Sequence, residues 1–161
     1  MDAFNLKRRS MRLPDYDYSS PGFYFVTLCV QNKELKMGTL NQHDINLNRI
    51  GYIVKECWEW LEEQYSYVRL DEYIIMPDHL HGIINILDTN CWGGSGAALY
   101  NEIKPLGSLI GAFKTVSTKR INQFILTPGK RFWQRNYYDR VIRDDKDLDE
   151  IRYYVRFNAD K

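Results

Sequence analysis

Two of the three histidines in the sequence, His79 and His81, stand on either side of Leu80. Alternate residues of a β-strand point to the same face, so this spacing predicts two imidazoles that project side by side. Neighbouring imidazoles can supply two ligands to one divalent ion, although two histidines at this spacing are also compatible with ordinary hydrogen-bonded strand residues. Gly82 follows the pair, and a glycine leaves room for a ligand or another backbone segment to approach. His43 lies in a polar stretch and is expected at the surface.

A second pair, Tyr154 and Asn158, occurs near the end of the sequence. Residues four apart lie on one face of a helix, so the two side chains are expected one above the other. A tyrosine can act as a covalent nucleophile, but its ordinary pKa of about 10 means that a base or a nearby positive charge must help it ionise at neutral pH. The asparagine oxygen suits a hard cation. Because the chain has twelve tyrosines, Tyr153, Tyr137 and Tyr138 are equally good candidates on residue type alone.

The charges along the chain are unevenly distributed, although the formal net charge is only +1. Residues 101–143 carry nine basic and two acidic side chains, whereas residues 13–100 carry five basic and twelve acidic ones. Such asymmetry indicates a polyanionic partner, or else a surface on which the two signs mix in space. The near-neutral sum therefore does not argue against nucleic acid.

The length and composition indicate one globular domain. The chain has 161 residues, 44% of them hydrophobic and 27% charged, which excludes a mainly disordered chain, a collagen-like repeat and a disulfide-rich miniprotein. Cys29, Cys57 and Cys91 form no metal-binding or redox spacing and fit a reducing compartment. Neither a signal-peptide core nor an apolar run of about 18 residues is present, so we expect a cytoplasmic protein with no membrane contact.

The pattern of apolar residues predicts a mixed α+β fold. The expected elements are a buried strand over 22–31, a helix over 45–64, strands over 68–76 and 80–87, a glycine-rich loop over 88–103, a helix from Pro105 to near Phe124, a strand over 138–142 and a final helix opened by Asp144 and the acidic residues after it. This β-α-β-β-α-β order is typical of a ferredoxin-like sandwich with an antiparallel sheet, here with an added C-terminal helix carrying Tyr154. We expect residues 1–20 to form a basic arm and lead-in, and residues 21–161 a single domain.

Several segments taken together resemble the single-tyrosine transposases that carry a histidine-hydrophobic-histidine (HUH) motif, and most closely the REP-associated tyrosine transposases. The segments are Pro77-Asp-His-Leu-His-Gly-Ile-Ile84, Arg8-Arg-Ser-Met-Arg-Leu-Pro14, Tyr16-Asp-Tyr18, Tyr24-Phe-Val-Thr-Leu-Cys29, Phe113-Lys-Thr-Val-Ser-Thr118, Phe132-Trp-Gln-Arg-Asn-Tyr-Tyr-Asp139, Val141-Ile-Arg143 and Ile151-Arg-Tyr-Tyr-Val-Arg-Phe-Asn158. They occur in the order of the family and span nearly the whole chain.

The resemblance implies a metal-dependent endonuclease and strand transferase that acts on single-stranded DNA at hairpin-associated sites. It implies that Tyr154 is the nucleophile, which stays joined to the 5′ phosphate and releases a 3′ hydroxyl. It also implies that His79, His81 and Asn158 hold a divalent ion, Mg²⁺ or Mn²⁺. The implied partner is hairpin-flanking single-stranded DNA, and the protein would be a monomer or a homodimer.

The same resemblance gives the basic residues a role in tracking the phosphate backbone. The candidate DNA-binding residues are Arg8, Arg9, Arg12, Lys114, Lys119, Arg120, Arg131, Arg135, Arg140 and Arg143. Trp133 is a candidate for stacking on unpaired bases, or alternatively a core residue.

Two other functions are compatible with the sequence. One is a domesticated relative that binds DNA hairpins without cutting them, because family members commonly continue past an Asn-Pro pair where this sequence has Asn158 and Ala159 near its end. The other is a small-molecule metalloenzyme of the kind that uses two histidines in a cupin barrel. The two long helical patterns argue against such an all-β fold.

Overall fold

The fold is known from a computed structural model that describes residues 12–89 and 103–160. Its elements are β1 (Gly22–Cys29), the 3-10 turn η1 (Gln31–Lys33), β2 (Gly38–Asn41), β3 (Asp44–Leu47), α1 (Arg49–Gln64), β4 (Val68–Ile75), β5 (His79–Ile86), α2 (Leu106–Ile125), β6 (Tyr138–Ile142), α3 (Asp145–Arg156) and the 3-10 turn η3 (Asn158–Asp160). The main sheet has the order β4-β5-β1-β6, and all its neighbouring strands are antiparallel. The ferredoxin-like α+β sandwich is thus confirmed, and the all-β alternative loses its structural basis.

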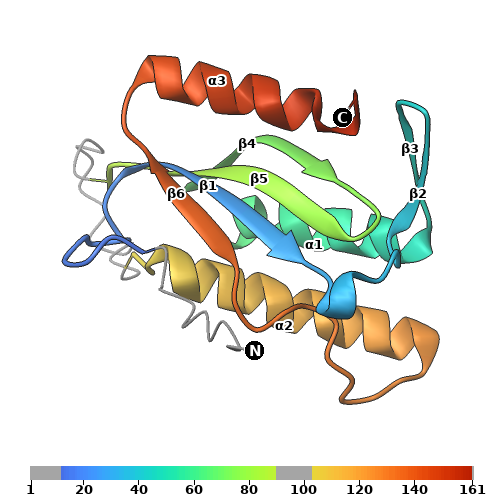
Figure 1. The fold of residues 1–161 in the computed structure, drawn as a ribbon. Helices are drawn as coiled ribbons and strands as arrows, with labels where there is room; N and C mark the ends of the chain where they lie inside the picture. Colours follow the sequence, from blue (N-terminus) through green and yellow to red (C-terminus); the bar gives the residue numbers. More distant parts are fainter. Residues whose placement is uncertain (1–11, 90–102, 161) are drawn as a thin grey trace, which may run out of the picture.

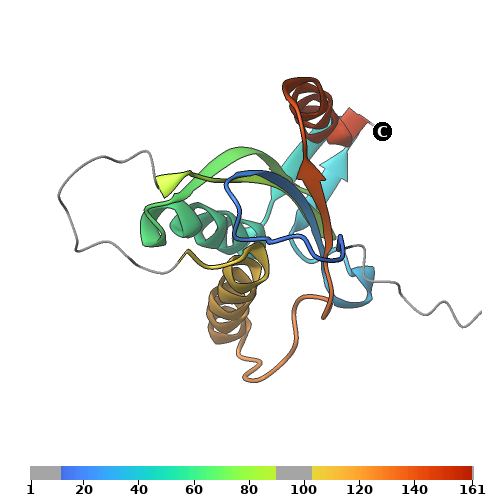
Figure 2. The same ribbon diagram turned by 90° about the vertical axis from the view of Figure 1, so that its left-hand side faces the viewer.

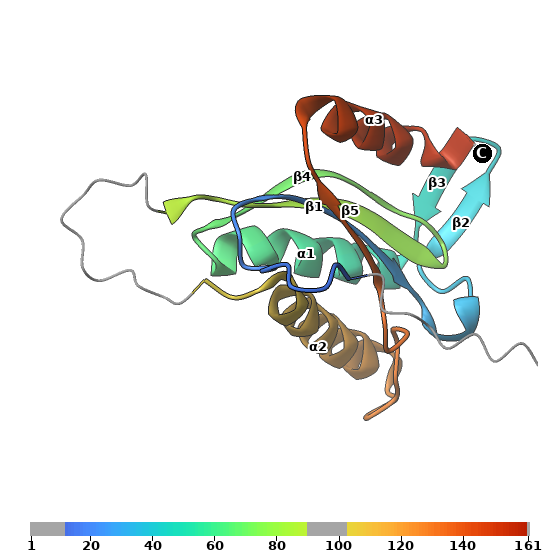
Figure 3. The same cartoon turned by 60° about the vertical axis from the view of Figure 1, so that its left-hand side comes forward.

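Helices cover both faces of the sheet. Helices α1 and α2 lie against one face and α3 against the other, as Figures 1 and 3 show. Strand β1 is buried between them, and its alternating side chains serve two separate cores. Tyr24, Val26 and Leu28 belong to the large core under α1 and α2, whereas Phe25 belongs to a small cluster under α3. This explains why the β1 sequence is apolar on both faces, as expected of a central strand.

The small cluster is what fixes α3 to the sheet. Its buried members are Phe25, Ile83, Ile142, Leu148, Ile151 and Val155, the last three of which recur at helical spacing along α3. Asp144 caps the helix by accepting a hydrogen bond from the backbone N–H of Asp147 at 2.7 Å, and Asp145 and Asp147 occupy the first turn. Carboxylates are favoured there by the free N–H groups and by the helix dipole, as the sequence predicted.

The predicted helix over 45–64 is wrong at its beginning. Residues 45–47 belong to β3, which pairs with β2 in a separate two-stranded hairpin beside the sheet. Helix α1 begins after Asn48, whose side chain accepts a hydrogen bond from the backbone N–H of Gly51 at 3.0 Å. The same side chain donates to the Lys36 carbonyl at 2.8 Å, so it joins the hairpin to the helix start. The asparagine cap therefore sets the residue at which the helix begins, although the apolar pattern continues from β3 into α1.

The other predicted elements lie within a few residues of their expected positions. Helix α2 continues to Ile125 and ends at Leu126, which adopts a left-handed conformation with φ of 57°. Figure 2 shows α1 and α2 side by side beneath the sheet, seen from one side. Most of the expected glycine-rich loop, 90–102, lies outside the described residues. Within the described ranges, no helix is both long and apolar enough to cross a bilayer.

Candidate active site and basic groove

Strand β5 places His79 and His81 on the sheet face that α3 covers, while Leu80 between them is buried in the core under α1 and α2. The two imidazole centroids are 4.6 Å apart, with the ring planes at 72°. The His81 ring is buried and stacks on Phe25 at 5.5 Å. The side-by-side arrangement that the sequence predicted is confirmed.

Each imidazole is held through its Nδ1 atom. His79 Nδ1 lies 2.6 Å from the Asp78 carboxylate, and His81 Nδ1 lies 2.7 Å from the hydroxyl of Thr27 on β1. When Nδ1 carries the proton and donates it to these oxygens, Nε2 keeps its lone pair for a metal ion. Burial, with a smaller contribution from the neighbouring His79, lowers the pKa of His81 to about 4. His81 is therefore neutral at pH 7, which is the form that binds metals.

Tyr154 reaches the histidine pair from the opposite layer. Its ring centroid lies 5.3 Å from that of His81, at an interplanar angle of 64°, and 6.1 Å from that of Phe25. The neighbouring Tyr153 is 66% exposed and packs on Phe157 at 4.5 Å. The structure thus separates two tyrosines that the sequence left equivalent, and brings Tyr154 to the imidazoles.

The other two tyrosine candidates lie elsewhere. The hydroxyl of Tyr137 accepts a hydrogen bond from Arg12 at 2.6 Å, and its ring lies near Lys114 of α2. Tyr138 is in the edge strand β6, where its ring meets the edge of Phe25 at 6.2 Å. Neither has the ring contact with His81 that Tyr154 has.

Asn158 is not in the same helix as Tyr154, contrary to the spacing argument. Helix α3 ends at Arg156, and Asn158 begins the 3-10 turn η3, where it is buried with 9% of its surface exposed. Within residues 12–89 and 103–160, no three histidine, cysteine or carboxylate side chains form a group that could hold a metal. The donor set here is therefore two imidazoles, which suit a divalent transition-metal ion such as Mn²⁺ when oxygen ligands complete the shell.

Gly82 has a structural role that differs from the one the sequence suggested. A Cβ atom at this position would lie 2.4 Å from Cζ2 of Trp58 on α1. The glycine therefore admits the Trp58 indole into the large core, on the sheet face opposite His81, and does not open space for a ligand.

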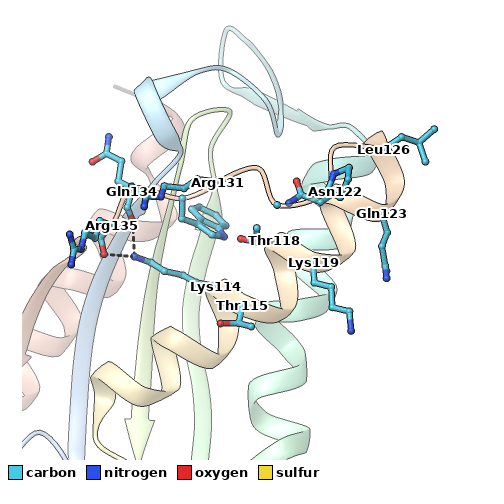
Figure 4. A pocket seen from close by; sticks show the side chains of 13 residues that line it. Lys114, Thr115, Thr118, Lys119, Asn122, Gln123, Leu126, Arg131, Gln134 and Arg135 are labelled. Atoms are coloured by element: carbon cyan, nitrogen blue, oxygen red, sulfur yellow. Dashed lines mark hydrogen bonds between the residues drawn. The ribbon is translucent and has the colours of Figure 1, made fainter.

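The basic residues of 101–143 do not share one face. Four of them line a groove of about 910 Å³ between the C-terminal half of α2 and the segment before β6. Figure 4 shows these side chains around the groove. We call it the basic groove and define it by Lys114, Lys119, Gln123, Arg131, Gln134 and Arg135.

The remaining candidate DNA-binding residues are engaged elsewhere or lie outside the described ranges. Arg120 binds Glu56 of α1, Arg140 binds Asp147 at 2.5 Å, and Arg12 contacts Asp139 at 3.6 Å. Arg143 lines a shallow hollow near Leu13 on the β6 side. Arg8 and Arg9 lie outside the described residues.

Trp133 is a core residue. Its side chain is 3% exposed, and its indole N–H donates to Ser117 at 2.9 Å. The ring packs on Phe113 and Phe132. It therefore supports the floor of the basic groove, and its face is not available to stack on a base.

Sequence reasoning missed the residues that hold the site together. Thr27 becomes a partner of His81 only through the pairing of β1 with β5, where the two are directly opposite. Asp78 directly precedes His79, but nothing in the sequence distinguishes it from an ordinary turn residue between the two predicted strands. The contacts of Arg152 with Asp71, described below, also depend on tertiary structure.

Comparisons with known proteins concern the family and the fold of the chain. No family model matches the sequence. A Haemophilus influenzae protein described as uncharacterized is 39% identical over 162 residues, covering 94% of this chain and 87% of that protein. The chain belongs to the same family as this protein. Membership of this family assigns no activity to the chain.

Two solved structures share the fold of this chain. One is a REP-associated tyrosine transposase bound to a REP hairpin, with a TM-score of 0.64 and 15% identity over 93% of this chain and 72% of that one. The other is a transposase-like protein from Deinococcus radiodurans, with a TM-score of 0.54 and 12% identity over 91% and 96% of the two chains. At these identities the likeness establishes a transposase-like fold.

Proposed function

We propose that this protein is a REP-associated tyrosine transposase, a metal-dependent endonuclease and strand transferase that acts on single-stranded DNA at hairpin-associated sites. The observation that carries the proposal is the ring contact of Tyr154 with His81, 5.3 Å between centroids, in one chain. A candidate nucleophile and a candidate metal-binding pair come from different layers of the fold and meet at one place. The similar solved structure bound to a REP hairpin supports DNA as the partner.

The proposed chemistry is an in-line exchange at phosphorus. The Tyr154 hydroxyl oxygen forms a bond to the scissile phosphorus while the bond from phosphorus to the 3′ oxygen breaks. The phenol loses its proton, the departing 3′ oxygen gains one, and the 5′ phosphate remains on the tyrosine. Attack by the 3′ hydroxyl of a second DNA end reverses these steps and restores the phenol, which transfers the strand.

His79 and His81 would hold the divalent ion through Nε2, and Asn158 is the proposed third ligand. When bound, the ion polarises the scissile phosphate and offsets charge that develops on its oxygens. Asp78 and Thr27 hold the two rings through Nδ1, so the Nε2 atoms need little reorganisation when the ion arrives. Tyr154 is 36% exposed, which leaves a route for a phosphate from solvent.

The decisive experiment uses a hairpin oligonucleotide with a single-stranded flank and different fluorophores on its two ends, incubated with Mn²⁺ or Mg²⁺. We expect release of the 5′ fragment and covalent attachment of the 3′ fragment to protein, resolved on a denaturing gel. Tyr154→Phe should abolish the adduct, and the matched control Tyr153→Phe should retain it. An adduct that persists in Tyr154→Phe would rule out this tyrosine.

The metal ligands are tested in the same assay. His79→Ala and His81→Ala should lose the adduct, whereas His43→Ala, in the exposed turn between β2 and β3, should keep it. Tight, salt-sensitive DNA binding that His79→Ala leaves unchanged, with no adduct in either metal, would instead establish a hairpin-binding protein that does not cut.

A further inference from the structure

The basic groove is the strongest feature outside the proposed active site. It contains four cationic side chains, and among residues 12–89 and 103–160 no acidic side chain lines it. The sequence explains this, because no aspartate or glutamate occurs between Ile103 and Tyr138. Since carboxylates elsewhere on the surface pair with most basic residues, an uncompensated cluster of this size favours an anionic ligand.

The groove is structurally rigid at its inner wall. Lys114 donates hydrogen bonds from Nζ to the carbonyls of Gln134 at 2.8 Å and Arg135 at 3.3 Å, as Figure 4 shows. These contacts tie α2 to the segment before β6. At the far end, the Asn122 amide donates to the Lys130 carbonyl at 2.7 Å and accepts from the Thr127 hydroxyl at 3.1 Å, which fixes the turn that closes the groove.

The groove also has groups suited to unpaired bases. Gln123 and Gln134 offer amide donors and acceptors, and the Leu126 side chain is 85% exposed at its rim. Base edges and base faces are accessible in single strands, whereas a duplex presents chiefly phosphates to such a surface. The mixture of cations, amides and an exposed apolar side chain therefore fits a single strand better than a duplex.

The groove lies at the same end of the sheet as the histidine pair. The backbone N–H of Gln134 donates to the Cys29 carbonyl at 2.9 Å, and Cys29 is directly opposite His79 in the sheet. Two strand spacings, about 10 Å, therefore separate the groove wall from the His79 backbone. The two sites face different layers, because α2 residues line the groove whereas the His81 imidazole contacts Tyr154 of α3. Figure 3 shows α2 and α3 on opposite faces of the sheet.

We propose that the basic groove binds a single-stranded DNA segment that continues from the scissile phosphate around the end of the sheet. The proposal rests on the proposed function for the identity of the strand, and it adds a second contact region remote from the tyrosine. Binding by the groove and reaction at Tyr154 are then separable, because different side chains carry them.

The first test measures affinity by fluorescence anisotropy with a labelled hairpin oligonucleotide bearing a long single-stranded flank, in EDTA. The variant is Lys119→Gln with Arg131→Gln, two groove residues. The plot of log K against log salt concentration has a negative slope. Loss of two phosphate contacts on a single strand should reduce the magnitude of that slope by about 1.4. The matched control, Arg49→Gln with Lys55→Gln, removes two cations of α1 outside the groove and should leave the slope unchanged.

The second test shortens the flank stepwise. Once the strand is too short to reach the groove, wild type and the groove variant should bind equally, which would place the contact on that segment. At saturating DNA the groove variant should still form the covalent adduct. The Tyr154→Phe variant should show the opposite pattern, with normal affinity and no adduct, so failure of either proposal is visible separately.

Three results would overturn the groove proposal. The first is an unchanged slope and affinity in the groove variant. The second is an equal effect of the α1 control pair. The third is equal groove dependence for a blunt duplex of the same sequence, which would assign the groove to double-stranded DNA.

Discussion

Arg152 holds Asp71 with two hydrogen bonds, 2.8 Å from Nε to Oδ1 and 2.6 Å from Nη2 to Oδ2. This two-point ion pair joins the helix that carries Tyr154 to the edge strand β4. The register of β4 with β5 shifts between Leu70 and Tyr73, and Asp71 lies in that irregularity. Irregular strand positions re-aim side chains, and here one carboxylate is presented to α3.

We expect Arg152→Gln to destabilise the protein by about 1 kcal/mol, because the pair is partly buried and has two-point geometry. The matched control is Arg156→Gln, which breaks a more exposed pair with Glu72 and should cost less. Urea denaturation of wild type, Arg152→Gln, Asp71→Asn and the double variant measures the pair by a double-mutant cycle, with Arg156→Gln measured alongside. A coupling energy near zero would show that the pair does not hold α3.

The same pair predicts a pH dependence of stability. The guanidinium of Arg152 holds the pKa of Asp71 below its usual value. At acid pH the unfolded chain therefore binds a proton at this residue before the folded chain does, and stability rises with pH in that range. The contribution is complete above about pH 5, where the unfolded aspartate is also ionised, and is lost as pH falls through the folded-state pKa. Thermal melts between pH 2.5 and 5 should show a shallower slope for Asp71→Asn, and an identical slope would contradict this.

Gly82→Ala should destabilise the fold by about 1–3 kcal/mol, because the new methyl group would displace the Trp58 indole from the large core. Gly111 provides the matched control, since nothing lies within 4 Å of a Cβ built there in the middle of α2. Gly111→Ala should stabilise by about 0.5–1 kcal/mol through helix propensity. Chemical denaturation measures both, and a neutral Gly82→Ala would show that Trp58 can repack.

Thr27→Val should weaken metal binding by about 10-fold to 100-fold while leaving the fold intact, because the hydroxyl orients the His81 ring through Nδ1. Thr115→Val makes the same substitution on α2, where the hydroxyl bonds only to the Gly111 carbonyl of its own helix. Mn²⁺ titration by calorimetry gives the affinities without any activity assay. Equal affinities for the two variants would mean that Thr27 does not position the ligand.

The order of elements and the placement of His79 and His81 could be predicted because they depend on local periodicity. The alternation of a strand decides which residues share a face, and it holds wherever the strand pairs. Tyr154 could not be separated from Tyr153 by the same logic, since adjacent helical positions differ by about 100° and only the docked face of α3 distinguishes them. The spacing of Leu148, Ile151 and Val155 indicates that face, and the structure confirms it. Which tyrosine meets the imidazoles follows only from where this face lies on the sheet.

Two further features depend on contacts that the sequence does not show. The β2–β3 hairpin was hidden because a side-chain cap at Asn48, and not a change in hydrophobicity, ends one element and begins the next. The sequence could not show whether the basic residues of 101–143 form one surface. Their order in the chain does not reveal which carboxylates lie opposite each of them in the fold. Arg120 meets Glu56 of α1, a residue from a distant part of the chain, whereas Lys119 beside it lines the basic groove.

The two halves of the proposed active site are anchored unequally. His79 and His81 lie in β5, which is hydrogen-bonded on both sides by β4 and β1 and backed by the large core. Tyr154 lies on a helix that rests on the small cluster of six buried side chains and on ion pairs at its rim. Opening of α3 exposes little of the large core, so its amides should exchange with deuterium at a free energy below that of global unfolding. The proposed nucleophile is therefore expected to leave the sheet while the imidazoles stay in place.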